Sequence, residues 1–242
     1  MKAHARLVAA LAGGRTVLRE LKSMAPLTLV PRRQRGPDAM VHLVNSATAP
    51  LGGDELHLEI RVEAGAQLKL SGVAATLALP GLREVPSLST VEVLVEDGGS
   101  FEYLPEPTVV TARAEHVAVL RADLAADARF QTREVLVLGR EGERPGRLSS
   151  TVHVTRGRVP ALRQTQTVGD APLDASLAVL AGHRVLVTEL EFGGPPRPAE
   201  SGPWWSRTPL AAGGALTTAV GPDVVTALSF GLSGVAESRL GQ

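Results

Sequence analysis

The sequence of 242 residues contains no cysteine. Disulfides, thiolate zinc sites, iron–sulfur clusters and cysteine nucleophiles are therefore excluded. Aromatic residues are also scarce, since four Phe, two Trp and one Tyr are too few to form stacking platforms along a single-stranded nucleic acid. Acidic and basic residues balance at 25 each, so the net charge indicates neither a nucleic acid nor an anionic membrane as partner.

Long hydrophobic runs are missing as well. The apolar stretch at residues 7–12 ends at two glycines and falls well short of the roughly 20 residues that a membrane helix needs. Lys2 and Arg6 accompany it, as basic residues accompany a secretory signal, but the stretch is only six residues long and no clear cleavage site follows. We therefore expect a cytoplasmic protein with neither a signal peptide nor a membrane segment.

The usual enzyme motifs are absent. The chain has no phosphate loop, no dinucleotide-binding glycine motif after a strand and no nucleophile elbow. Its six histidines are scattered, with the nearest two, His42 and His57, 15 residues apart, which excludes a local metal-binding pair. His57 and Glu59 would lie on one face of a strand, as joint metal ligands or as part of a solvated surface. A hydrolase whose triad comes from distant Ser, His and Asp residues remains an alternative, because triads do not depend on sequence order.

What dominates the first 160 residues is alternation of apolar and polar side chains. Residues 56–62, 68–70, 91–95 and 101–103 all follow it. Side chains of a strand point alternately to opposite faces, so this pattern predicts half-buried strands and fits helices badly. We expect a mainly β protein, with many antiparallel strands in stacked sheets, a β-helix-like arrangement and about two helices.

A weak internal repeat lies within this pattern. Residues 61–68, 94–101 and 123–130 resemble one another, with turns at Gly65, Gly98 and Asp127. Gly and Asp tolerate the positive φ that a tight hairpin demands. The repeat predicts a stack of similar hairpins, each completed by its neighbour. Chance recurrence of ordinary hairpin turns is the alternative.

The second half of the chain has fewer clear signals. We expect a single β domain over residues 1–242, in which a Pro/Gly-rich loop occupies residues 193–203. Gly221 and Pro222 suit the start of a helix over residues 223–240. Further predicted elements are strands at 133–138 and 150–155, a strand pair within 178–192, and a short helix at 173–180.

Carboxylates and two tryptophans are the candidate functional residues. Oxygen ligands spread over several turns could line a passage for a divalent cation, although composition alone favours turn chemistry and surface solubility as their explanation. Trp204 and Trp205 in the Pro/Gly-rich region either cap a core or anchor a partner protein. The carboxylates are Asp54, Glu55, Glu102, Glu106, Glu134, Glu141 and Glu143.

Four segments occur in an order that resembles a known family. They are N-S-A-T-A-P-L-G-G-D at 45–54, the G-A-x-L turn at 65–68, F-E-Y-L-P-E at 101–106 and L-G-R-E-G-E at 138–143. Together they resemble the urease accessory protein UreD, also called UreH, over about residues 5–190. The chain departs from the family pattern at 71–80 and at Glu106-Pro107.

The resemblance implies a non-enzymatic scaffold or chaperone with a mostly β fold. Family members bind apo-urease and the accessory protein UreF, recruit the GTPase UreG through UreF, and support nickel insertion. They are thought to carry an internal passage for nickel, so Ni²⁺ would bind transiently and no cofactor tightly.

Carried onto this chain, the resemblance suggests particular site residues. The family positions that match best are Asp54, Glu134, Arg140 and Glu143, which we assign to a candidate nickel path with no catalytic residue among them. Trp204 and Trp205 are assigned to a candidate interface with UreF. A β-rich module that binds a polysaccharide or a protein surface, without any role in metal delivery, is the alternative, and the few aromatic residues argue against sugar stacking.

Overall fold

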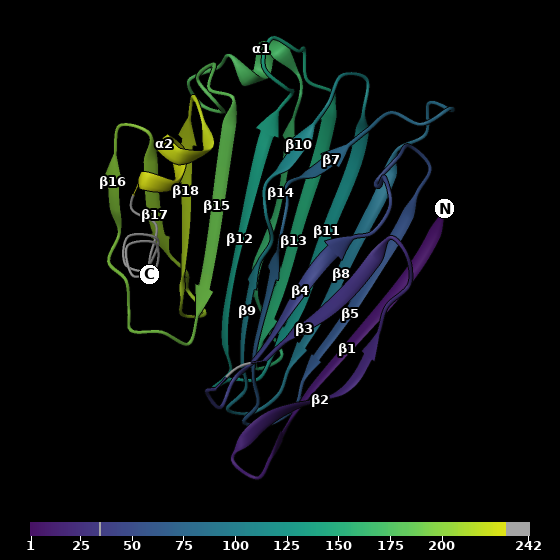
Figure 1. The fold of residues 1–242 in the computed structure, drawn as a ribbon. Helices are drawn as coiled ribbons and strands as arrows, with labels where there is room; N and C mark the ends of the chain where they lie inside the picture. Colours follow the sequence, from purple (N-terminus) through teal and green to yellow (C-terminus); the bar gives the residue numbers. More distant parts are fainter. Residues whose placement is uncertain (34, 231–242) are drawn as a thin grey trace.

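The computed structural model describes residues 1–33 and 35–230, which form two β-sheets packed face to face (Figure 1). One sheet has seven strands: β1 (Lys2–Ala12), β2 (Arg15–Lys22), β5 (Glu55–Val62), β8 (Ser87–Val95), β11 (Glu115–Leu124), β13 (Arg147–Arg156) and β14 (Val159–Val168). The other has eleven: β3 (Leu27–Arg32), β4 (Ala39–Asn45), β6 (Gln67–Gly72), β7 (Thr76–Ala78), β9 (Ser100–Leu104), β10 (Thr108–Val110), β12 (Arg129–Leu138), β15 (Val185–Phe192), β16 (Glu200–Gly202), β17 (Trp205–Pro209) and β18 (Ala215–Gly221).

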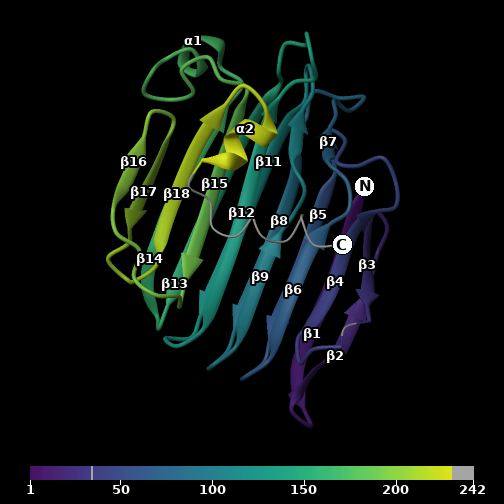
Figure 2. The same cartoon turned by 60° about the vertical axis from the view of Figure 1, so that its left-hand side comes forward.

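The strand order explains the shape seen in Figures 1 and 2. The seven-stranded sheet runs β14-β13-β11-β8-β5-β1-β2, and the main path of the eleven-stranded sheet runs β16-β17-β18-β15-β12-β9-β6-β4-β3, with β7 and β10 paired beside β12. From β5 to β12 the chain passes repeatedly between the two sheets, with β6 and β7, and then β9 and β10, consecutive in the eleven-stranded sheet, so the chain winds as a solenoid. The predicted mainly β fold with stacked, β-helix-like sheets is confirmed, with 58% strand and 4% helix among the described residues.

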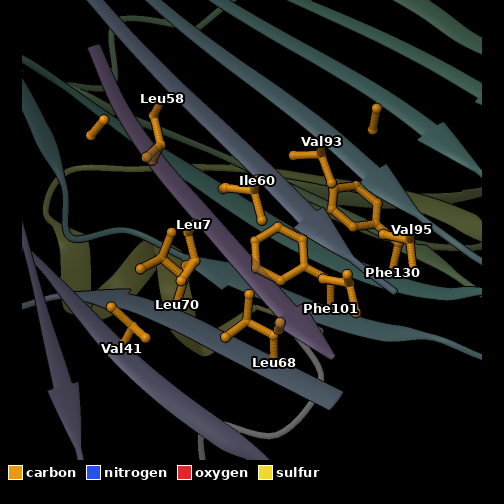
Figure 3. Packing of buried hydrophobic residues seen from close by; sticks show 14 of the residues in the cluster. Leu7, Val41, Leu58, Ile60, Leu68, Leu70, Val93, Val95, Phe101 and Phe130 are labelled. Atoms are coloured by element: carbon orange, nitrogen blue, oxygen red, sulfur yellow. The ribbon is translucent and has the colours of Figure 1, made fainter. Parts of the chain in front are cut away.

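The predicted alternation places the core between the sheets. In β5, Leu58 and Ile60 are buried while the residues between them are not. They pack with Leu68, Phe101 and Phe130 from the opposite sheet, as Figure 3 shows. All five side chains are at most 2% exposed, and burial of each contributes about 1.5–3 kcal/mol.

The repeat predicted around Gly65, Gly98 and Asp127 forms a stack, but its units are not hairpins. At each turn the chain passes from the seven-stranded to the eleven-stranded sheet, so the two flanking strands face each other instead of pairing. Their backbone groups pair in parallel with the next unit, as β5 does with β8 and β6 with β9. The hairpin prediction was wrong because alternation has the same period of two in parallel and antiparallel strands.

The turns themselves also differ from the prediction. Gly65 and Gly98 have φ values of +68° and +65°, as expected. Asp127 is not among the residues with positive φ, and its Oδ1 instead accepts a hydrogen bond of 3.0 Å from the Gly98 backbone N–H. Antiparallel pairing, predicted for many strands, is found at the two ends of the stack, in β1–β2 and β3–β4 and from β13 and β12 onward.

Both helices are short. Helix α2 (Val224–Ser229) begins where predicted, with Asp223 accepting a 2.9 Å hydrogen bond from the Thr226 N–H as N-cap. It ends before the predicted residue 240, because Phe230 is in the extended conformation, and the predicted part beyond residue 230 lies outside the described residues. Helix α1 (Ala171–Asp174) lies earlier than the predicted 173–180, because Asp170 caps it and Pro172 occupies its first turn. No helix in the described part of the chain is long and apolar enough to cross a membrane.

Two smaller predictions need correction. The predicted strand pair within 178–192 is one strand, β15, since residues 177–182 form turns. The predicted loop at 193–203 contains the short strand β16, which pairs with β17. The predicted strands at 133–138 and 150–155 are confirmed as parts of β12 and β13.

Candidate functional site

A cavity of about 180 Å³ lies between the two sheets. Much of its wall is apolar, with Leu58, Leu120 and Leu190 among the lining residues. Polar side chains also line the cavity. They occupy inward-facing alternate positions of the strands, where apolar core residues are usual. The polar lining residues include Tyr103, His116, Thr132, Glu134, Ser150 and Thr188.

The acidic residue Glu134 lines this cavity and lies on a central strand. It occupies β12 between the buried Phe130 and Leu136, at the same inward-facing alternate positions. Ser150 Oγ, on β13 of the opposite sheet, donates a hydrogen bond of 2.8 Å to Glu134 Oε1. Burial raises the pKa of the Glu134 carboxyl, and the Ser150 hydrogen bond offsets part of this rise.

Other polar groups surround Glu134. Thr188 is its register partner on β15 and donates a 3.1 Å hydrogen bond to Gln166 Oε1 on β14. Burial, together with the nearby Glu134 charge, raises the pKa of the Tyr103 hydroxyl. The group therefore presents hydroxyl and carboxyl oxygens from both sheets to one interior space.

His116 lines the same cavity, close to where β11 begins. Its Nδ1 lies 2.8 Å from the buried Ser87 Oγ, and burial lowers its pKa to about 4. The imidazole is therefore neutral at pH 7 and able to bind a cation. Within residues 1–33 and 35–230 no carboxylate is hydrogen-bonded to His116, so Ser87 and His116 lack the third member of a hydrolase triad.

The remaining predicted path residues lie in loops at one edge of the sheets. Asp54 directly precedes β5, where its buried carboxylate accepts a 2.8 Å hydrogen bond from Leu51 N–H and pairs with the Met1 amino group. Arg140 and Glu143 lie between β12 and β13. Since β5, β8, β11 and β13 run parallel, these loops share the edge at which those strands begin.

The Glu143 carboxylate is hydrogen-bonded within its own turn. Its Oε2 accepts a 2.9 Å hydrogen bond from Arg140 N–H, and this bond is the main reason that the Glu143 pKa is lowered. Arg184 Nη2 donates to the Arg140 carbonyl over 2.7 Å. Of the four predicted path residues, Glu134 alone lines the cavity, which reaches the loop edge through Pro50, Pro105 and Glu106. No group of three or more metal-binding side chains is gathered anywhere in the described residues.

Comparison with known proteins identifies the family. The family model described as UreD urease accessory protein matches residues 1–224. The chain belongs to the UreD family. It is 52% identical over 233 residues to urease accessory protein UreD 1 of Saccharopolyspora erythraea, covering 94% of this chain and 91% of that protein. It is 37% identical to a UreD of Parafrankia sp. (93% and 84% covered) and 38% identical to that of Streptomyces avermitilis (88% and 87%).

The two tryptophans of this UreD-family protein have different surroundings. Trp204 is 41% exposed, and its ring meets the His183 ring edge-on with centroids 4.5 Å apart. Trp205, at the start of β17, is half-buried against a cluster that contains Val187 and Ala219. This cluster lies beneath α2 on the outer face of the eleven-stranded sheet (Figure 2). Trp205 therefore caps a small core, whereas Trp204 is available to a partner.

Sequence reasoning missed His116, Ser150 and Thr132 as members of the polar cavity. A signal existed in β12, where Thr132 and Glu134 replace apolar residues at two successive inward positions. Ser150 carries the same signal in β13, between the buried Leu148 and Val154. Polar residues at inward-facing positions of a strand, where the other inward residues are apolar, indicate an interior polar site. A search for surface carboxylates does not find such a site.

Proposed function

We propose that this UreD-family protein is a non-catalytic scaffold, or chaperone, for urease maturation, which binds apo-urease and passes nickel to it. In this proposal it binds UreF directly and UreG through UreF, in the cytoplasm. Family membership supports the role in urease maturation. The observation that supports nickel transfer is the buried polar cavity around Glu134, between the two sheets.

The cavity suits transient passage of a divalent cation. Moving such an ion into protein is costly unless oxygen or nitrogen ligands replace its water. Glu134, Ser150, Thr188 and the neutral His116 offer such atoms from both sheets. Because they form no closed cage of three or more metal-binding side chains in the described residues, retention is weak, as transfer requires. Ni²⁺ is thus cargo, and no tightly bound cofactor is expected.

The loop residues extend the proposed path at the edge of the sheets. Asp54, Arg140 and Glu143 lie in loops at the edge that the cavity reaches through Glu106. The carboxylates would attract a cation there, while Arg140 holds Glu143 in its turn. Trp204, which is exposed, supplies the proposed surface for UreF, whereas Trp205 packs on the small core beneath α2.

The test separates nickel delivery from assembly. Urease activity, urease-bound nickel and the yield of the complex with urease and UreF are measured in cells that express each variant. Glu134→Ala and Glu143→Ala are expected to lower activity and bound nickel more than complex yield. Glu134→Gln keeps the size of the side chain. Glu141→Ala is the matched control for Glu143→Ala, because Glu141 is an exposed carboxylate in the same loop.

Two outcomes would contradict the proposal. If activity falls only in proportion to the yield of the complex, Glu134 and Glu143 hold the scaffold together and carry no nickel. If the wild-type chain does not co-purify with urease and the other accessory proteins, the alternative of a β-rich binding module without a role in metal delivery is favoured.

A further inference from the structure

The cavity between the two sheets changes from polar to apolar along its length. Its mouth lies at the edge where β11 begins and is lined by Pro105 and the exposed Glu106. Glu134 and Ser150, which are hydrogen-bonded to each other across the sheets, lie farther in. Ser150 is the register partner of Ala118 on β11, and Leu120 follows at the next inward position. The cavity therefore combines an interior carboxylate with an apolar inner end.

The inner end is lined by side chains from four neighbouring strands of the seven-stranded sheet. Successive register partners form this wall: Leu58, Val91, Leu120 and Val152. All but Leu58 are only half-buried, although they occupy inward positions, because they border the cavity. Beyond them the core is closed by side chains that are at most 2% exposed, which include Ile60, Phe101 and Phe130 (Figure 3). Such a wall offers no ligand atoms to a metal ion, but contact with an apolar molecule would remove its surface from water.

Glu134 provides the polar end of this space. Ser150 Oγ donates to Glu134 Oε1, whereas Glu134 Oε2 has no hydrogen-bond partner and no Lys or Arg pairs with the carboxylate within residues 1–33 and 35–230. The neighbouring Arg133 is directed to the outer face, where its Nε lies 2.9 Å from Glu189 Oε2. A buried carboxylate is costly without a cation, and it can accept several hydrogen bonds at once. Glu134 can therefore accept N–H groups from a ligand without losing Ser150.

We propose that the cavity binds a small organic cation, whose amidinium or ammonium head pairs with Glu134 and whose apolar body fills the inner end. The cavity volume of about 180 Å³ suits one six-membered ring with a head group, since an apolar cavity of about 150 Å³ is enough to hold benzene. An amidinium presents two parallel N–H groups, which match the geometry of a carboxylate.

A ligand in this position also has a consequence for nickel. It occupies the carboxylate that the proposed nickel path uses, so it would block that path while it is bound. This consequence rests on the proposed function, whereas binding of the ligand does not. The two are therefore tested separately.

The test uses the full-length chain and benzamidine as the probe, in calorimetric titration without nickel or urease. Benzamide has the same ring but no charge, and acetamidine has the same head group but no ring. Each should bind at least about tenfold more weakly than benzamidine, because benzamide lacks the charged hydrogen bonds and acetamidine lacks the apolar contact.

Variants locate the head group. Glu134→Gln should weaken benzamidine binding at least about tenfold, since it removes the charge that the amidinium meets. Glu102→Gln is the matched control and should leave binding nearly unchanged. Glu102 precedes Tyr103 of the cavity lining, but it faces outward and lies 3.3 Å from Lys69 Nζ. Thermal unfolding checks that each variant is folded.

Nuclear Overhauser effects between the benzamidine ring and the methyl groups of Leu58, Leu120 and Val152 should locate the ring at the inner end. No binding to the wild-type chain, equal binding of benzamide, or unchanged binding by folded Glu134→Gln would overturn the proposal. If benzamidine fails to bind while Glu134→Ala still impairs nickel delivery, the organic ligand alone is rejected. If benzamidine binds as expected while Glu134→Ala leaves nickel delivery intact, the nickel path alone is rejected.

Discussion

At the scale of single residues, Glu134 is an ionisable carboxyl group in a buried position, which disfavours its charged form. Its position between two sheets raises the pKa of its carboxyl, whereas a turn lowers the pKa of Glu143. A raised carboxyl pKa means that the folded protein holds the proton more tightly than the unfolded chain. The stability this group contributes is present at low pH and is lost as the pH rises through the folded pKa. For Glu143 the sign is reversed.

The first prediction follows from these signs. Glu134→Gln should raise the free energy of unfolding relative to wild type at pH 8, and the gain should shrink toward pH 4. Glu143→Gln, as the opposite case, should lower stability near neutral pH and have less effect at low pH. Urea unfolding from pH 4 to pH 8 measures both. A gain for Glu134→Gln that does not change with pH would contradict the assignment.

A second residue-scale prediction concerns the ion pair of Arg133 and Glu189 on the outer face of β12 and β15. Arg133 Nε donates to Glu189 Oε2 over 2.9 Å, and these side chains are only 15% and 1% exposed. Removing Arg133 takes away the cation that offsets the burial of the Glu189 carboxylate. Arg133→Met should therefore cost about 3 kcal/mol of stability in chemical unfolding.

The matched control for Arg133 is an exposed arginine. Arg61 pairs with Glu96 at 2.6 Å, but these side chains are 45% and 30% exposed, so solvent screens the pair. Arg61→Met should cost much less stability than Arg133→Met, because solvent screens the exposed pair. Equal losses of stability in Arg133→Met and Arg61→Met would show that the buried ion pair contributes no more to stability than the exposed pair.

At the scale of elements, the turns between the sheets decide whether the parallel units stack. Gly98 joins β8 to β9 with a φ of +65°, in which an L-residue is strained. Its N–H also binds Asp127 of the next unit. Gly98 therefore has two roles: it adopts the positive φ that the turn requires, and its N–H contacts the next turn of the stack.

The third prediction tests this turn. Gly98→Ala should lower stability by about 1–2 kcal/mol, because alanine at positive φ is strained. Gly194→Ala is the control, since Gly194 has no positive φ and an added Cβ would contact nothing within 4 Å. Thermal and chemical unfolding compare the two. Equal stability of the two variants would show that the Gly98 turn tolerates a side chain.

At the scale of the whole molecule, the two tryptophans distinguish assembly from folding. Trp204 is exposed beside His183, whereas Trp205 packs on the core beneath α2. A tryptophan that acts as a hot spot at the centre of a protein interface contributes about 2 kcal/mol or more to binding. A side chain in a core contributes to stability instead.

The fourth prediction separates these roles. Trp204→Ala should reduce the yield of the complex with UreF while leaving the unfolding midpoint nearly unchanged. Trp205→Ala should lower the midpoint because the cluster around Val187 loses its cover. Pull-down yield and thermal unfolding of each variant are the measurements. Full complex yield from folded Trp204→Ala would remove Trp204 from the proposed interface.

Parts of the site follow from sequence and others do not. Glu134 was identified from its match to a family pattern, and the structure places it in the cavity wall. Its hydrogen-bond donor Ser150 and the neutral His116 come from other strands of the opposite sheet. Neither could be paired with Glu134 from sequence, because the pairing depends on how the sheets stack.

The sequence by itself determined that this is a mainly β protein without disulfides or a thiolate metal site, and it determined which side chains face inward. Alternation is a local property, so Leu58, Ile60 and Glu134 are directed inward whatever strand lies beside them. Only the tertiary structure decided that the repeat units pair in parallel across turns such as Gly65, and which polar groups meet inside. Those contacts join residues far apart in the chain, and a side-chain period of two is the same for every way of pairing strands.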